Sequence, residues 1–356
     1  MVSALRQAII PILAVFTALV LGAVLIWMSG ASGVEAYRGL FEGMLGSWRA
    51  LIETCVSATP YILTGLSVAL AFRCGLFNIG AEGQFYMGAL GSAIVGYAVR
   101  ELPAWIHLPL ALAAGAVSGA IWGAIPGFLK ARLGAHEVIN TIMMNYIAVK
   151  LVDYLVKNVL RDPTASIDRT PYVLPTAQLP QLLGQGYRLH AGFLIALGAV
   201  VLLYGLLFKT TIGFEIRTVG ANPNAARYAG VNVAWSFLLT MSIAGALAGL
   251  AGAGEVLGLN HNLPAAFSTG YGFDAIAVAL LAKSSPLGII PSAFLWGGLR
   301  NGAGLMQVRT GISIDLINIV QALVIMFIAA DQIVRWIYRI KPRVKTEIVF
   351  TRGWGK

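Results

Sequence analysis

Long apolar runs alternate with short polar segments along almost the whole chain. Most of these runs approach the ~20 apolar residues that an α-helix needs to cross a lipid bilayer, and some are short or interrupted. The pattern predicts an all-α polytopic membrane protein, with about ten transmembrane helices, some of them broken, in the membrane-spanning region 8–333. The runs cover residues 8–29, 51–71, 79–99, 106–129, 136–156, 190–208, 233–255, 271–282, 286–306 and 314–333.

The composition supports a membrane protein and excludes most other classes. Of the 356 residues, 58% are hydrophobic and only 11% are charged, whereas soluble domains carry about 25% charged residues. A soluble enzyme of this length could not bury so much apolar surface, and a disordered or disulfide-rich secreted chain is excluded as well. The first run, 8–29, is longer than the ~7–15 residues of a signal-peptide core, so we expect it to be a retained anchor.

The distribution of basic residues predicts the orientation. The net charge of +10 could indicate nucleic acid, but in membrane proteins Lys and Arg gather on the cytoplasmic side. With ten spans and an inner N-terminus, fifteen basic residues fall on inner segments and eight on outer ones, while Lys150 and Arg300 lie within or at the edge of runs. We therefore expect no nucleic-acid partner, and a protein of the cytoplasmic membrane whose two termini, including the basic tail 334–356, are cytoplasmic.

Two polar stretches separate the runs. Residues 157–189 contain four prolines and should form an irregular outer loop. Residues 209–232 form the inner loop, where Asn222 and Pro223 suit the N-cap and first position of a short helix that ends at Gly230. A capped helix is more than a solvated connector needs, so we favour a docking element. Its candidate contact residues are Asn222, Pro223, Ala225, Ala226, Arg227, Tyr228 and Gly230.

Glycine spacing predicts one tight helix contact. Gly115, Gly119, Gly123 and Gly127 recur every four residues in the fourth run. This spacing places all four on one helix face, where the missing side chains let another backbone approach closely.

Two interruptions of the hydrophobic pattern resemble each other. Residues 75–84 and 268–277 both contain Gly, then Phe, then a small polar residue, then Ile among small neighbours. In the predicted topology one lies on the inner side and the other on the outer side, five spans later. An odd offset makes corresponding helices antiparallel, so we expect two inverted-repeat halves, formed by runs two to five and seven to ten.

Polar and aromatic residues of these interruptions, joined by Asn140 and Asn145 of the fifth run, are candidates for a substrate pathway, because polar groups inside a membrane are costly and usually face a cavity or a partner. Glu82 could instead meet water at the inner interface, and Asn140 and Asn145 could simply bond neighbouring helices. Aromatic and amide side chains suit a ribonucleoside, whose base stacks and whose sugar forms hydrogen bonds. The candidates are Phe77, Asn78, Glu82, Gln84, Asn140, Asn145, Phe273 and Asp274.

Signatures of catalysis are missing from the sequence. It contains no G-x-x-x-x-G-K-[ST] and no H-E-x-x-H, and its two cysteines and four histidines lack metal-ligand spacing. We therefore expect no catalytic residue, no metal and no cofactor, and any energy for transport must come from a partner.

Four segments carry a family resemblance: GLFNIGAEGQFYMGALG, AHEVINTIMMNYIA, TVGANPNAARYAGVNV and GYGFDAIAVALLAKSSPLGI. They resemble the permease subunits of ABC importers of the branched-chain amino acid and ribose type, nearest the nucleoside and simple-sugar branch that works with a Bmp-type lipoprotein. The resemblance spans about residues 50 to 330. It implies a single permease domain that translocates nucleosides or related simple sugars and is itself no enzyme.

The same resemblance implies three protein partners. A cytoplasmic ABC ATPase would dock at residues 222–230, a second permease subunit would complete a heterodimer, and a substrate-binding lipoprotein would act outside the membrane. ATP hydrolysis would then take place on the separate ATPase subunit.

Two other functions compete with this one. An ion-coupled secondary transporter of small polar solutes would use an intramembrane acid such as Glu82, Glu255 or Asp274 as its ion or proton carrier. A membrane enzyme of lipid or cell-wall chemistry would need acids, His or Arg clustered near one interface, and the sequence indicates no such cluster. The capped inner helix favours the ABC permease over the secondary transporter.

Overall fold

The computed structural model describes residues 2–339 except 185, 266, 268, 269, 312, 314 and 330. Within these residues the secondary structure is helical, apart from two isolated β-bridges. Most of the predicted basic tail, from residue 340 onward, lies outside the described residues.

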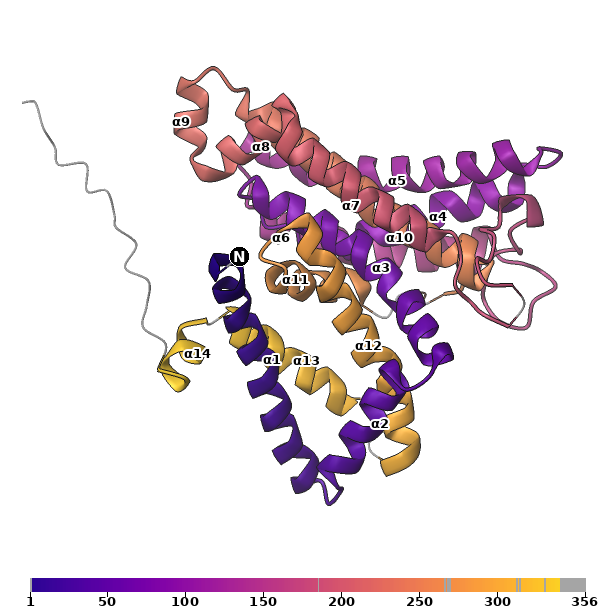
Figure 1. Ribbon diagram of the computed structural model, residues 1–356. Helices are drawn as coiled ribbons and strands as arrows, with labels where there is room; N and C mark the ends of the chain where they lie inside the picture. Colours follow the sequence, from indigo (N-terminus) through magenta and orange to yellow (C-terminus); the bar gives the residue numbers. More distant parts are fainter. Residues whose placement is uncertain are drawn as a thin grey trace, which may run out of the picture.

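Each of the ten predicted apolar runs coincides with a helix (Figure 1), so this part of the prediction is confirmed. Two of these helices, α6 and α10, continue in short π-helical segments, η1 (Leu155–Val159) and η3 (Val256–Asn260). The ten helices are α1 (Val2–Met28), α3 (Trp48–Arg73), α4 (Ala81–Ala98), α5 (Ala104–Leu133), α6 (Glu137–Tyr154), α7 (Gly192–Lys209), α10 (Val233–Glu255), α11 (Tyr271–Leu281), α12 (Pro286–Thr310) and α13 (Asp315–Ala329).

In the described chain, α2 (Gly33–Leu45), α8 (Thr211–Ala221) and the short α9 (Pro223–Tyr228) lie outside the predicted runs, and α14 (Asp331–Ile337) begins at the end of the last run. Because α2 contains charged residues, it does not form an apolar run in the sequence. Ser32 caps its first turn, and the helix packs along the second half of α12. There Gly43 lies against Gly302. The described part of the stretch after η1 is irregular, as predicted, with one short 3₁₀ helix, η2 (Pro175–Ala177).

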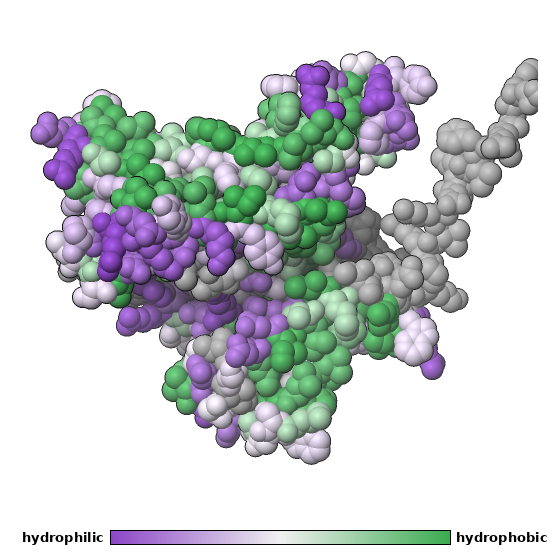
Figure 2. Space-filling model, turned by 180° about the vertical axis from the view of Figure 1, so that it is seen from behind, coloured by the Kyte–Doolittle hydropathy of each residue, from purple (hydrophilic) through white to green (hydrophobic). Residues whose placement is uncertain are grey.

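Five helical segments of the described chain are long and apolar enough to cross a membrane: α3, α5, α6 with η1, α7, and α10 with η3. Residues 12–28 of α1, together with α11 and α13, form shorter apolar helices. The apolar part of α3 is mostly buried by its neighbours, whereas α5 and α6 expose most of theirs. Figure 2 shows hydrophobic side chains over much of the face behind, with hydrophilic groups gathered at the α8–α9 tip and at the opposite end.

The two predicted halves, α3–α6 and α10–α13, pack on each other reciprocally. The first helix of one half, α3, packs on α12 and α11, which are the third and second helices of the other. In the same way α10 packs on α5 and α4. This exchange of partners agrees with two structurally related halves, and it places α3 and α10 at the centre of the molecule.

The glycine seam of α5 is confirmed, and its partner is α10. A Cβ atom added to Gly119 would lie 2.2 Å from the carbonyl oxygen of Gly245, and one added to Gly123 would lie 2.4 Å from that of Met241. From the other side, a Cβ atom on Gly249 would lie 2.4 Å from the carbonyl oxygen of Gly115. The two backbones are therefore in direct contact, at a distance that only glycine permits.

We expect Gly119→Ala to destabilise the protein. The new methyl group would meet backbone, which cannot rotate away, and overpacking of this kind costs about 1–3 kcal/mol. The matched control is Gly198→Ala on α7, where an added Cβ meets nothing within 4 Å. Thermal unfolding of the purified variants in detergent tests this, and an unchanged Tm for Gly119→Ala would contradict the seam.

Candidate functional site

The first turns of α4 and α11 meet in the interior of the molecule. A Cβ atom added to Gly272 would lie 2.1 Å from the backbone nitrogen of Glu82, and the Gly272 N–H donates to Glu82 Oε2 at 2.6 Å. The Glu82 side chain is 4% exposed, so it lies in the interior and not at a water-facing interface. Its carboxylate lies at the positive N-terminal end of α11, where helix dipoles favour negative charge.

Three buried amide side chains hold the break between α3 and α4. Asn78 and Gln84 bond each other, with Asn78 Nδ2 donating to Gln84 Oε1 at 3.1 Å, while Asn78 Oδ1 accepts the Gly80 N–H. Asn145 reaches across from α6 to bond the backbone at the end of the break and in the first turn of α4. Its Oδ1 accepts the Gly83 N–H and its Nδ2 donates to the Ile79 carbonyl, both at 2.8 Å.

This arrangement assigns the three amides Asn78, Gln84 and Asn145 to the protein's own hydrogen bonds. All three are at most 3% exposed. Non-helical backbone is tolerated at membrane depth only when its polar groups find such partners. Their location near the break agrees with the sequence prediction, and their recorded contacts support a role in packing.

The three other candidates outside the cavity described below are more exposed. Phe77 and Phe273 are 42% and 47% exposed, and Phe77 packs on Phe72 with ring centroids 4.8 Å apart. Asn140 is partly buried, and its Nδ2 has no hydrogen-bond partner within the described chain.

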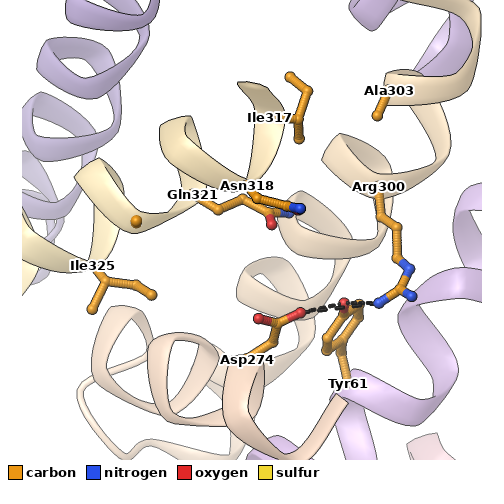
Figure 3. Close-up of a pocket in the computed structure, with 9 residues that line it drawn as sticks. Tyr61, Asp274, Arg300, Ala303, Ile317, Asn318, Gln321 and Ile325 are labelled. Carbon is orange, nitrogen blue, oxygen red and sulfur yellow. Dashed lines mark hydrogen bonds and ion pairs between the residues drawn. The ribbon is translucent and has the colours of Figure 1, made fainter. Parts of the chain in front are cut away.

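Asp274 lines a cavity of about 410 Å³ between α3, α11, α12 and α13. Tyr61 donates to Asp274 Oδ2 at 2.8 Å and accepts from Arg300 Nη1 at 2.8 Å, so its hydroxyl bridges the acid and the base (Figure 3). Arg300 also lies 4.6 Å above the ring of Tyr271. The lining residues are Tyr61, Asp274, Arg300, Ala303, Ile317, Asn318, Gln321, Ala322 and Ile325.

The sequence prediction missed most of this polar wall. The sequence does contain a signal for Arg300, because a charged residue within an apolar run implies a buried partner. Asp274 lies in another apolar run and is a candidate for that partner. No sequence signal identifies Tyr61, since an aromatic residue in an apolar helix is most often a packing residue.

The predicted inner helix is confirmed as α9 (Pro223–Tyr228), which lies with α8 at one tip of the molecule (Figure 1). The Asn222 side chain accepts hydrogen bonds from the N–H groups of Asn224 and Ala225. At the other end Gly230 has a φ of 84° and the Val231 N–H bonds the Ala226 carbonyl, which is Schellman geometry.

One expected contact residue of this helix requires correction. Ala226 is fully buried against the rest of the protein, so it fixes α9 in place and offers no docking surface. The other six candidates are exposed, and Tyr228 is the most prominent at 95%. A large aromatic side chain that stands fully in solvent on a rigid, capped turn has the character of an interface hot spot.

The α8–α9 tip is joined closely to the break between α3 and α4. A Cβ atom on Gly220 would lie 2.1 Å from the Arg73 carbonyl oxygen, so the end of α8 rests directly on the end of α3. Arg73 Nε in turn donates to the Ser284 carbonyl at 2.8 Å, between α11 and α12. The exposed helix α9 is therefore linked by short contacts to both halves.

A second cavity, of about 650 Å³, lies beside the irregular stretch between η1 and α7. Trp105 on its rim is 77% exposed. Nearby, burial lowers the pKa of His190 to about 4 and also lowers the pKa of His261. The lining residues are Ala104, Trp105, Leu108, Pro175, Gln178, Leu179, Pro180, Gln181 and His261.

Comparison with known proteins gives consistent matches over most of the chain. The family described as branched-chain amino acid transport system, permease component, matches residues 50–329. The guanosine ABC transporter permease protein NupP of Bacillus subtilis (strain 168) is 43% identical over 95% of this chain and 97% of its own length.

Two further relatives have comparable coverage. The nucleoside ABC transporter permease protein NupB of Lactococcus lactis is 38% identical over 92% of both chains. The glucose ABC transporter permease protein TsgB13 of Haloferax volcanii is 37% identical over 90% of this chain and 87% of its own length. Bacillus subtilis also has a second, more distant match, the guanosine permease protein NupQ, at 29% identity over 68% of this chain and 78% of its own length.

We expect Asn145→Leu to lower stability markedly, because it leaves the Gly83 N–H and the Ile79 carbonyl without a partner in the interior. Each buried unsatisfied group costs about 1–3 kcal/mol. The control is Asn158→Leu, since Asn158 also bonds a backbone carbonyl but is exposed. Thermal unfolding in detergent gives the comparison, and equal Tm values for the two variants would show that Asn145 does not hold the break.

Proposed function

The chain belongs to the permease family of branched-chain amino acid transport systems, and we propose that it is the membrane-spanning subunit of an ABC importer for nucleosides or related simple sugars. The family match covers nearly all of α3 to α13. The relatives are named as permeases for guanosine, nucleosides and glucose, all of which contain a hydroxylated sugar ring. They are transporter subunits and not enzymes, which favours this function over an ion-coupled carrier.

The observation that carries the coupling proposal is the exposed, capped helix α9. A permease driven by a separate ATPase must receive its movement through a rigid surface that faces the cytoplasm. A short helix seated in a groove is an established mode of recognition. We assign the contact to Arg227 and Tyr228, which are exposed and offer charge and stacking.

Movement of α9 would reach the transmembrane helices through α8. Gly220 rests on the end of α3, and Arg73 bonds the segment between α11 and α12. A displacement at the tip would therefore act on the helix breaks of both halves together, and the predicted pathway passes the point where α4 and α11 meet. Asp274 contributes to the cavity wall, and Asn140 lies near the start of α6. The remaining candidates lie in or beside the breaks: Phe77, Asn78, Glu82, Gln84, Asn145 and Phe273.

We assign two other partners from the similarity to known permeases and from the surface of the molecule. The pair NupP and NupQ in one organism supports a second, different permease subunit and hence a heterodimer. Exposed apolar side chains on α5 and α6 provide surface for that subunit and for lipid. The outer loop with its second cavity faces the side on which a substrate-binding lipoprotein would deliver its cargo.

We expect Tyr228→Ala and Arg227→Glu to uncouple ATP hydrolysis from uptake. Loss of an interface hot spot costs about 2 kcal/mol or more, so substrate-stimulated ATPase activity and uptake should fall by about tenfold or more. The measurement uses proteoliposomes that contain the permease with its ATPase, second permease and binding protein.

Matched controls separate docking from general damage. Tyr154→Ala removes a tyrosine of 60% exposure at the far end of α6, and Arg132→Glu reverses an exposed charge at the end of α5. Both should retain coupled uptake. Full coupling in Tyr228→Ala and Arg227→Glu would reduce α9 to a connector and remove the structural support for the ABC mechanism.

We expect both termini and the α8–α9 tip on the cytoplasmic side. A reporter that is active only in the cytoplasm should work when fused after Lys356 or inserted at Asn224, and should be silent at Leu183 in the outer loop. An active reporter at Leu183, or a silent one after Lys356, would contradict the orientation.

A further inference from the structure

The cavity between α3, α11, α12 and α13 is lined by an acid and a base that do not form a tight ion pair. The closest nitrogen–oxygen distance between Arg300 and Asp274 is 4.0 Å, and the Tyr61 hydroxyl bridges them. The two charged side chains are 29% and 30% exposed, although they lie on helices of the membrane-spanning region. Figure 3 shows Asn318 and Gln321 extending from α13 into the same space.

Packing alone does not account for this wall. Charged groups within the membrane are costly, and a pair kept only for stability would be expected to bond directly and be shielded. Here a third side chain separates the charges, and both remain accessible from the cavity. A carboxylate accepts hydrogen bonds and a guanidinium donates them, so this wall offers a ligand in the cavity both kinds of partner.

The chemistry of the wall selects a neutral, polyhydroxylated ligand. The charges of Asp274 and Arg300 sum to zero, so the wall does not favour binding of an anion or a cation. A hydroxyl group both donates and accepts, so adjacent hydroxyls on one ring can donate to a carboxylate while they accept from a guanidinium. The aliphatic side chains of Ala303, Ile317 and Ile325 line the same cavity and suit the apolar face of a sugar ring.

The size of the cavity agrees with such a ligand. Its volume of about 410 Å³ falls within the ~300–1,000 Å³ typical of small-molecule sites. The walls come from α3 of one half and from α11, α12 and α13 of the other. A change in how the two halves pack would therefore change the site.

We propose that Tyr61, Asp274 and Arg300 form a transient subsite for the ring hydroxyls of the transported sugar moiety, with Asn318 and Gln321 opposite. This inference rests on the proposed import of nucleosides or simple sugars. It identifies the chemical group that those substrates share and the side chains that bind it. Because a binding protein delivers the cargo, the subsite sets the rate of passage and the preference among sugars, without tight binding.

The test measures hydroxyl preference in proteoliposomes that contain the complete transporter with its partner subunits. One arm compares uptake of guanosine with 2′-deoxyguanosine, and the other compares glucose with 2-deoxyglucose. The variants are Asp274→Asn and Tyr61→Phe. Each preference is a ratio within one preparation, so it does not depend on how much protein folds, and the binding protein's own selectivity cancels between wild type and variant.

The readout is taken from the arm whose substrate the wild type transports. There the ratio of uptake of the hydroxylated sugar to uptake of its deoxy analogue should fall by about tenfold in Asp274→Asn, as expected for loss of hydrogen bonds to a charged acceptor. Tyr61→Phe should lower the preference by a smaller factor, because the acid and base remain. The matched control is Arg309→Lys, which alters another ion-paired arginine of α12, bonded to Glu42 outside the cavity. Its preference should equal that of the wild type.

The outcomes separate this inference from the function on which it rests. Uptake by the wild type with an unchanged preference in Asp274→Asn and Tyr61→Phe would overturn the subsite and leave the proposed function intact. No uptake in either arm by the wild type would overturn the proposed function, and the subsite with it. Inhibition of uptake by leucine that disappears in Arg300→Lys would assign the cavity to a zwitterion and also overturn the sugar subsite.

Discussion

A helix that breaks within an apolar interior exposes backbone N–H and C=O groups that need partners, because lipid and packed side chains supply none. The meeting point of α4 and α11 satisfies this constraint, and the arrangement of the central helices depends on it. Glu82 accepts the Gly272 N–H across the junction, and Asn145 bonds the end of the break and the first turn of α4. The first half thus supplies both partners, Glu82 for the start of α11 and Asn145 for the break that precedes α4.

The same contacts explain how a distant surface can act on the centre. Gly220 brings the end of α8 against the end of α3, and Arg73 links α3 to the segment before α12. Backbone contacts of this kind have little freedom to absorb a displacement, since no flexible side chain lies between them. The glycine seam between α5 and α10 likewise favours movement of these helices as one body.

The breaks and the cavity use polar groups in different ways. At the breaks, Asn78, Gln84 and Asn145 are fully buried and bond the chain itself. At the cavity, Asp274 and Arg300 are bridged by a hydroxyl and stay partly exposed. Burial with complete pairing indicates a structural role, whereas accessible charges of opposite sign indicate recognition of a ligand. This contrast redirects the search for substrate contacts from the breaks to the wall that Asp274 shares with Arg300.

The sequence by itself determined the helical class, the ten apolar helices, the glycine seam and the capped turn at Asn222–Gly230. Each rests on a local signal: hydropathy over a helix length, four-residue spacing, or cap chemistry within a few positions. It could not reveal α2, whose charges interrupt hydropathy, or the burial of Ala226, which depends on what packs beneath α9. Only the tertiary structure decided that Tyr61, Asp274 and Arg300 meet, because these residues lie far apart in the chain and their proximity follows from the reciprocal packing of the two halves.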